Sequence, residues 1–409
     1  MRRITSKPCG TAWLRLGSLR QLVGPSNEGE HQAVVDCGTV RFLHSADWQL
    51  GMTRRWLTPR IQGRYDDARL AAVAALGRVA REQGAEFVVV AGDVFDHVQV
   101  EPRTAASALR ALEQIGLDVF LLPGNHDHLS AAGVYSSRWF GTDKPGNVHV
   151  LGESGIHVVR PGVELLVAPW SSNQPPSRQL DRLAAEAEPI TAGAVRIGVG
   201  HGGIDRLVPQ GTEDLLRLEL FEQAVRERRI DLVCLGDRHS LTNVGDTGRI
   251  WYSGTPETTR RDEVKPGYVA VVELTPNDAP KVTPHRVGTW TIKEREFPMS
   301  DAESVAQVLA WLDDFEAPER TVAKPILKGM LSLTEHNRLT EEIERRALLF
   351  AAIPSSGRTA LRPRADVADF SDLDLTGFVK AAAEELGSMD TTASANALAL
   401  LVRLQAEVN

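Results

Sequence analysis

The stretch Phe87-Val88-Val89-Val90-Ala91-Gly92-Asp93-Val94-Phe95-Asp96 decides the fold of this chain. A run of β-branched and aromatic residues is typical of a buried strand, and this run ends in Gly and Asp. Buried parallel strands end at the carboxyl edge of their sheet, where α/β proteins hold their ligands. Because Gly92 lets the backbone turn away from the strand, we expect Asp93 to point into a site.

The segments around this strand alternate between two hydrophobic periods. Residues 40–44 and 118–122 are strand-like, whereas 65–82 and 102–115 carry apolar residues at helical spacing. Strand–helix–strand–helix–strand is the pattern of a parallel sheet with crossover helices. The sequence therefore predicts an α/β fold.

Composition limits the classes of protein to consider. The chain has 409 residues, 42% of them hydrophobic, which is enough for two or three domains. Its net charge is −8, so a phosphate-rich substrate must be held by metals or local arginine clusters. The three cysteines form no CxxC pair, and no apolar run approaches the length of a membrane span. We expect a cytoplasmic protein with no membrane contact and no structural disulfides.

The organisation of the chain follows from shifts in composition and period. Residues 1–39 have no clear period and are predicted to be a disordered extension. The segments after them are a first domain over 40–276, a small α+β module over 281–353, a linker over 354–372, and two amphipathic helices within 373–409.

Polar side chains of metal-ligand types follow five of the predicted strands. They are Asp47 with Gln49, Asp93, Asn125 with His126, His201, and Asp237 with His239. Any one of them alone is more simply explained as a cap or turn residue, but five strand ends in one domain indicate one site. The mixture of carboxylate, amide and imidazole suits Mn²⁺, Fe²⁺ or Zn²⁺, and the cysteine count excludes a four-cysteine zinc site.

These strand ends also carry a resemblance to a known family. In order, Asp47-Trp48-Gln49, Gly92-Asp93-Val94-Phe95-Asp96, Gly124-Asn125-His126-Asp127, Gly200-His201 and Gly236-Asp237-Arg238-His239 resemble the five motifs of calcineurin-like metallophosphoesterases. Residues 43–51 and the stretch Tyr252-Ser253-Gly254-Thr255-Pro256 look more narrowly like SbcD-type DNA repair nucleases. The resemblance implies a four-layer α/β/β/α sandwich over 40–276, with 281–353 as a capping domain and a C-terminal helical tail.

The resemblance further implies a centre of two divalent ions that clamp a phosphate and lower the pKa of a water between them. It assigns the ligands as Asp47, His239 and Gln49 for the first ion, Asp93 as the bridge, and Asn125, His201 and Asp237 for the second. His126 is implied as the general acid or as a stabiliser of the phosphate. Asp96 and Asp127 are candidates for orienting the histidine ligands, and turn or cap roles explain these two equally well.

Two of the implied ligands depart from the family pattern. Gln49 and Asp237 stand where the family usually has histidine. The amide oxygen of Gln49 is a harder donor than imidazole, and Asp237 adds a negative charge. We therefore expect the site to prefer Mn²⁺, or Mg²⁺, over Zn²⁺, with activity in Mn²⁺ and little in Zn²⁺.

Arginines near two of the motifs are candidate nucleic-acid contacts. They are Arg54, Arg55, Arg60 and Arg64, interleaved with Trp56 and Tyr65, and the pair Arg260-Arg261. Arginines and aromatic residues together suit backbone neutralisation and base stacking, whereas a solvated loop is the simpler alternative.

The sequence leads to one favoured function and two alternatives. The favoured function is an SbcD-like, metal-dependent DNA exonuclease or endonuclease acting in repair. The resemblance implies a homodimer whose C-terminal helices engage an SbcC-like coiled-coil ATPase, although these helices can equally pack on their own chain. The first alternative is a phosphodiesterase or phosphatase acting on nucleotides or cyclic nucleotides. The second is a catalytically weakened scaffold that binds DNA or the ATPase, which the departures at Gln49 and Asp237 leave open.

Overall fold

The computed structural model describes residues 37–172, 177–208, 215–357, 360–364, 377–389, 391, 393–394, 397–398 and 400–401. The predicted disordered extension lies outside this described part, apart from residues 37–39. Among the described residues, no helix combines the length and the apolar character needed to cross a membrane.

The first sheet holds the strand Phe87–Ala91 that precedes Asp93. Its order is β12-β11-β1-β2-β3-β4. The bounds are β1 Val40–Ser45, β2 Phe87–Ala91, β3 Asp118–Leu122, β4 Val148–Val150, β11 Tyr268–Leu274 and β12 Lys281–Arg286. Strands β1 to β4 pair in parallel, and β11 and β12 add an antiparallel edge. The carboxyl ends of the parallel strands therefore meet at one side of the sheet.

The second sheet has the order β5-β6-β7-β8-β10-β9. Its bounds are β5 Gly155–Arg160, β6 Val163–Val167, β7 Val195–His201, β8 Leu232–Gly236, β9 Thr242–Val244 and β10 Ile250–Tyr252. Strands β6, β7, β8 and β10 are parallel, while β5 and β9 are antiparallel edges.

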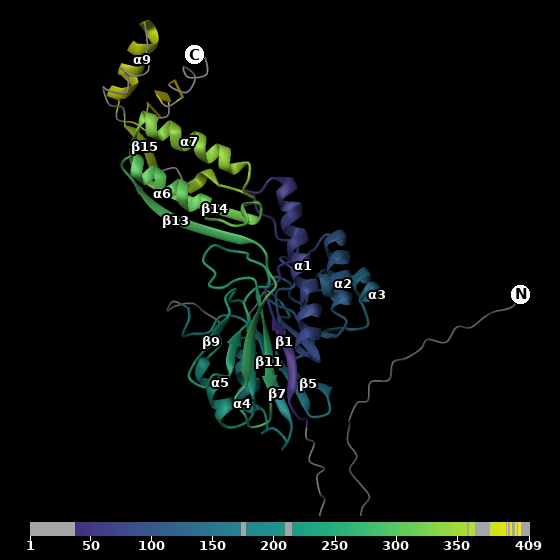
Figure 1. Cartoon of the computed structure of the whole chain (residues 1–409). Helices are drawn as coiled ribbons and strands as arrows, with labels where there is room; N and C mark the ends of the chain where they lie inside the picture. Colours follow the sequence, from purple (N-terminus) through teal and green to yellow (C-terminus); the bar gives the residue numbers. More distant parts are fainter. Residues whose placement is uncertain are drawn as a thin grey trace, which may run out of the picture. The chain divides into compact units, whose positions relative to one another are not determined.

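Helices cover the outer faces of both sheets (Figure 1). On the first sheet they are α1 Pro59–Gln83, α2 Pro102–Ile115 and α3 Arg138–Asp143; on the second they are α4 Ser177–Glu186 and α5 Leu218–Arg226. A separate apolar core, including Phe42, Val89, Ile197 and Cys234, lies between the sheets. Alternate strand residues thus face a helix layer or the other sheet, and both faces are buried. The predicted four-layer α/β/β/α sandwich is confirmed.

The ends of α1 show why this helix spans its observed residues. Thr58 accepts a hydrogen bond from the backbone N–H of Ile61, and Pro59 occupies the first turn, where its missing N–H costs nothing. Gly84 ends the helix in the left-handed conformation at φ 66°. Three local signals therefore fix the helix that packs against β1 and β11.

The module after the sandwich has its own sheet and core. It consists of parallel strands β13 Thr291–Met299, β14 Thr321–Ser332 and β15 Ala360–Arg364, with helices α6 Ala302–Asp313 and α7 Leu333–Ala347 (Figure 1). Short 3₁₀ turns lie at Pro318–Arg320 and Ser355–Gly357 of this module, and at Val134–Ser136 of the sandwich. Phe297, Val308, Leu327 and Ile343 belong to the core of the module, which we call the cap.

The observed borders of the cap differ from the predicted ones at both ends. Residues 281–286, predicted to open the cap, form β12 on the edge of the first sheet. Residues 360–364, predicted to lie in a linker, form β15 on the edge of the cap sheet. Both are edge strands with little apolar alternation, and each contains a proline, which argues against a strand in sequence alone.

Part of the predicted C-terminal tail is described. Helix α9 spans Gly377–Ser388, and Ala383 packs with Leu398 against Leu333 at the start of α7. Phe378 of the same helix is 86% exposed. Most of the second predicted helix, 392–408, lies outside the described residues.

Candidate metal centre

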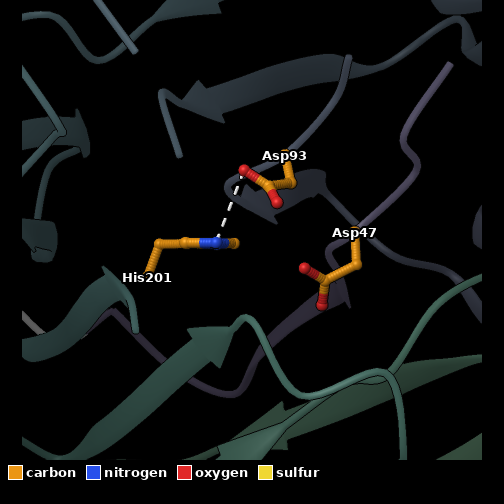
Figure 2. Close-up of side chains that lie close together, drawn as sticks. All are labelled: Asp47, Asp93 and His201. Atoms are coloured by element: carbon orange, nitrogen blue, oxygen red, sulfur yellow. Dashed lines mark ion pairs between the residues drawn. The ribbon is translucent and has the colours of Figure 1, made fainter. Parts of the chain in front are cut away.

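Three of the predicted ligands meet at the carboxyl ends of β1, β2 and β7. Asp47, Asp93 and His201 are buried, and one ligand atom from each lies within 4.8 Å of the others. Figure 2 shows the two carboxylates and the imidazole ring close together. Residues far apart in the sequence therefore form one cluster because their strands end at the same place.

The backbone is strained at this cluster. The described non-glycine residues with positive φ are Asp47 (56°), Gln49 (45°), Asp93 (55°) and Asp237 (93°), together with Arg228, Lys265 and Asn277. Four of these seven are predicted metal ligands. Positive φ is unfavourable for residues with a Cβ and persists where surrounding structure enforces it, typically at functional sites.

Two glycines make room for the histidine at the centre. A Cβ on Gly92, whose φ is +94°, would lie 2.1 Å from Nδ1 of His201. A Cβ on Gly236 would lie 2.0 Å from the carbonyl oxygen of Ala91. No side chain fits at either position, so both glycines are needed for the close approach of β2, β7 and β8.

His201 is oriented with one ring nitrogen toward the cluster. Its Nδ1 donates to the carbonyl oxygen of Ala91 at 2.8 Å. Its Nε2 lies 2.8 Å from Oδ1 of Asn125 and 3.4 Å from Oδ1 of Asp93. The backbone bond leaves Nε2 facing the same point as two oxygen donors, where the neutral ring would offer its lone pair to a metal ion.

The ring of His239 is also fixed through its Nδ1, here by Thr259 and Glu263, two residues that were not predicted from the sequence. Its Nδ1 lies 2.6 Å from Oγ1 of Thr259 and 3.0 Å from Oε1 of Glu263. Its Nε2 faces Nε2 of Gln49 at 3.3 Å and Oδ1 of Asp47 at 3.9 Å. A carboxylate behind a metal-binding histidine is a common device for orienting the ring. No local signal marks Glu263, which lies 24 positions after its histidine.

The electrostatics of the cluster fit a bound cation. Burial raises the pKa of Asp47 to about 7, although His239 and His201 oppose that shift. Burial alone would also raise the pKa of Asp93, but His201 and His126 hold it below the usual value. Burial alone would lower the pKa of His201, yet the carboxylates of Asp93 and Asp47 raise it well above its usual value. Buried carboxylates of this kind are stabilised by a cation, and the oxygen and imidazole donors suit a divalent metal.

Asp237 reaches the cluster through its backbone. Its N–H lies 3.0 and 3.1 Å from the two carboxylate oxygens of Asp47. Its own side chain is exposed and lines the cavity beside His239, outside the group of three buried ligands. Its predicted role as a metal ligand stays a prediction.

His126 lies at the solvent-facing side of the cluster. Its backbone N–H donates to Oδ1 of Asp93 at 3.0 Å, and its Nδ1 donates to the carbonyl oxygen of Asp96 at 2.8 Å. The ring is exposed, and its Nε2 makes no hydrogen bond to a described residue. Asp96 thus orients His126 with its backbone carbonyl, and its predicted role beside a histidine ligand stays a prediction.

Asp127 organises the loops rather than a histidine. Its buried carboxylate accepts hydrogen bonds from the N–H groups of Gly124 and Phe95, at 2.7 and 3.1 Å, and from the hydroxyl of Tyr135. Burial raises its pKa to about 6. Of the two roles that the sequence left equally open, these three donors from two loops give Asp127 the turn role and leave its carboxylate away from the histidine ligands.

The structure separates the predicted arginine contacts into two groups. Arg54, Arg260 and Arg261 line a cavity of about 440 Å³ together with Trp56. Arg55, Arg60 and Arg64 are exposed and line neither this cavity nor the one beside His239. Tyr65 is buried and donates its hydroxyl to the carbonyl of Thr258, so it is not available for base stacking.

Comparison with known proteins identifies the class. Residues 40–272, more than half of the chain, match the family described as calcineurin-like phosphoesterase, and the chain belongs to this family. It is a metal-dependent phosphoesterase with a candidate metal-binding triad. A divalent ion held by such ligands acts as a Lewis acid toward a phosphoryl oxygen.

The individual proteins to which the chain is similar share low sequence identity with it. The chain is 24% identical over 251 residues to the SbcD component of the nuclease SbcCD of Bacillus subtilis, covering 59% of this chain and 54% of that protein. It is 27% identical over 119 residues to the uncharacterized metallophosphoesterase YhaO of Bacillus subtilis, covering 27% of each chain. The chain thus spans about half of one relative and about a quarter of the other. A dimetal phosphatase from Danio rerio is similar with a TM-score of 0.37 at 12% identity, over 58% of this chain and 96% of that chain.

Proposed function

We propose that this chain is a two-metal phosphodiesterase that cleaves nucleic acid, with DNA as its substrate. Its sequence is similar to the SbcD component of the nuclease SbcCD, which supports this assignment. The observation that carries the proposal is a second, basic cavity beside the one that His239 lines.

The two cavities are neighbours. The first, of about 280 Å³, is lined by Asp237, His239 and Glu263 among others. Arg260 and Asp262 line both this cavity and the second one. A small phosphoester needs only the first cavity. A polynucleotide presents a base and a further phosphate next to the scissile bond, so it suits both.

The second cavity is positively charged in a chain with a net charge of −8. The ionisable residues that line it are Arg54, Arg260, Arg261, Lys293 and Lys324, against Asp262 and Glu294. Glu294 lies 3.2 Å from both Arg261 and Lys324. Arg260 and Lys293 make no ion pair or hydrogen bond to any described residue. These two cations are therefore free to neutralise phosphates.

Trp56 gives this cavity a surface for a base. Its side chain is 40% exposed in the cavity wall, where Ile292 and Pro354 add apolar contact. Base stacking on an aromatic side chain is insensitive to sequence and needs an unpaired base. We therefore assign the cavity to the nucleotide next to the scissile phosphate.

The residues of the first cavity and of the buried cluster take the catalytic roles. Asp93 would be shared by two divalent ions, Mn²⁺ or Mg²⁺ in preference to Zn²⁺, because oxygen donors dominate the site. The exposed ring of His126, whose Nδ1–H is held by the Asp96 carbonyl, would in its doubly protonated form give the Nε2 proton to the leaving oxygen and become neutral. Asp47, Asn125, His201 and His239 would complete the ligand set, with Gln49 and Asp237 at the positions where the family usually has histidine.

One experiment separates this function from its alternatives. The purified chain is incubated in Mn²⁺ with labelled single-stranded and double-stranded DNA, cyclic AMP and a chromogenic phosphodiester. We expect DNA cleavage that Asp93→Asn and His126→Ala abolish and His149→Ala preserves, because His149 is an exposed histidine paired with Asp118. Hydrolysis of cyclic AMP without cleavage of DNA would overturn the choice of substrate. Inactivity on every substrate, with DNA binding retained, would indicate a scaffold.

The partner is a further part of the proposal. We assign the C-terminal segment to an SbcC-like ATPase, supported by the 86% exposure of Phe378 in α9. A homodimer is proposed on the sequence resemblance, and a cytoplasmic location on the three scattered cysteines.

A further inference from the structure

We propose that Glu257 is a positioning residue that couples the start of the cap to the metal ligand His239. The coupling runs through the segment Thr255–Glu263, which overlaps the end of the Tyr-Ser-Gly-Thr-Pro stretch noticed in the sequence. The inference depends on a metal centre at His239 and does not require that the substrate be DNA.

One end of this segment is bonded to the residues that lead into the cap. Trp290 directly precedes β13, and its side chain is buried against Tyr65, with ring centroids 4.9 Å apart. The hydroxyl of Thr258 donates to the carbonyl of Trp290 at 2.8 Å. The hydroxyl of Tyr65 donates to the carbonyl of Thr258 at 2.6 Å. Val322 and Ala351 of the cap belong to the same apolar cluster.

Glu257 joins these parts with a buried carboxylate. Its two oxygens accept hydrogen bonds from the N–H groups of Thr258, Thr289 and Trp290, at 2.9, 2.8 and 2.9 Å, and from the hydroxyl of Thr289 at 3.2 Å. The side chain is 2% exposed. A buried carboxylate with four donors holds one geometry, because losing any donor leaves charge unsatisfied.

The next residue along the chain contacts the metal ligand. Thr259 follows Thr258 directly, and its hydroxyl lies 2.6 Å from Nδ1 of His239. Its N–H and its hydroxyl also donate to Glu263, whose Oε1 lies 3.0 Å from the same Nδ1. Thr258 thus binds Trp290 at the start of the cap, and its neighbour Thr259 binds the ring of His239. A displacement of Trp290 has to move Thr259 or break buried hydrogen bonds.

The same segment also touches Asp47, another of the predicted ligands of the first ion. The hydroxyl of Thr255 lies 2.9 Å from the carbonyl oxygen of Asp47 and 2.8 Å from that of Glu257. Both Asp47 and His239 are therefore connected to Glu257. By thermodynamic reciprocity, a cap position that favours this geometry raises metal affinity, and bound metal favours that cap position.

The test measures metal affinity in the full chain. Mn²⁺ is titrated calorimetrically into the wild type, Glu257→Gln and Thr258→Val, with folding checked by circular dichroism. Glu257→Gln keeps the shape but removes the charge and two acceptor positions; Thr258→Val removes only the hydroxyl bond to Trp290. We expect the affinity of one Mn²⁺ to fall at least about 5-fold in each variant, the lower end of typical coupling energies. If Glu257→Gln does not fold, Thr258→Val decides the outcome.

Ser332→Ala is the matched control. Ser332 caps α7 by accepting from the N–H of Glu335, so its loss destabilises the cap without touching the Glu257 junction. We expect unchanged Mn²⁺ affinity in this variant. Wild-type affinity in both junction variants would overturn the inference, as would an equal loss of affinity in Ser332→Ala.

Discussion

Truncating Trp56 tests whether the second cavity binds a nucleotide. The change is Trp56→Ala, which removes the aromatic surface from the cavity wall and leaves Arg54, Arg260 and Lys293 in place. Because the side chain is 40% exposed and contributes little to the core, we expect the variant to fold normally.

The size of the effect follows from the contact that is lost. Stacking of one base on an aromatic side chain contributes about 1–3 kcal/mol, which corresponds to about 5- to 150-fold in Kd. A single-stranded oligonucleotide is expected to lose affinity within this range. A chromogenic phosphodiester occupies only the first cavity, so its kcat/KM is expected to stay within about 2-fold of the wild type.

The assay compares both substrates under identical Mn²⁺ and salt conditions. Oligonucleotide binding is followed by fluorescence anisotropy, and turnover of the chromogenic substrate by absorbance. Phe378→Ala, which removes an exposed aromatic side chain from α9, is the control and should alter neither value. Equal oligonucleotide affinity in Trp56→Ala and the wild type would refute the stacking role, and an equal loss on both substrates would place Trp56 in the catalytic machinery instead.

Three further predictions concern the metal centre and the fold. Glu263→Gln should weaken binding of one Mn²⁺ about 10- to 100-fold in calorimetry, because the ring of His239 loses its charged partner; unchanged affinity would contradict that role. Mn²⁺ at about 100 times its Kd should raise the free energy of unfolding by about 2.7 kcal/mol in urea titrations, and Asp93→Asn should lose most of this gain. Burial raises the pKa of Asp181 to about 6, so ionisation costs the folded state stability as the pH rises from about 4 to 6. Asp181→Asn should therefore gain about 1–2 kcal/mol relative to the wild type between pH 4 and pH 7.5, less than the full shift implies because solvent screens part of the charge; a constant difference would show that Asp181 does not titrate there.

The sequence predicted much of the fold because its strands are fully buried. The runs at Phe87–Ala91 and Asp118–Leu122 are largely continuous apolar segments, and the alternating helices follow from the 3.6-residue period of α1 and α2. The edge strands β12 and β15 were missed, since an edge strand with a proline carries no such pattern. Both borders of the cap were misplaced for that reason.

Part of the candidate site was likewise predictable from the sequence, and part was not. Sequence alone determined which side chains stand at strand ends, and the parallel pairing of β1 with β2 then placed Asp47 beside Asp93. His201 ends β7 of the second sheet and joins them because the two sheets pack face to face. Only the tertiary structure decided which residues form hydrogen bonds with the side chains around the site. Asp127 binds loop N–H groups instead of a histidine, Glu263 orients His239, and Glu257 ties that segment to the cap. The physical reason is that a strand end is encoded by its own residues, whereas a hydrogen-bond partner is chosen by what the whole fold brings within about 3 Å.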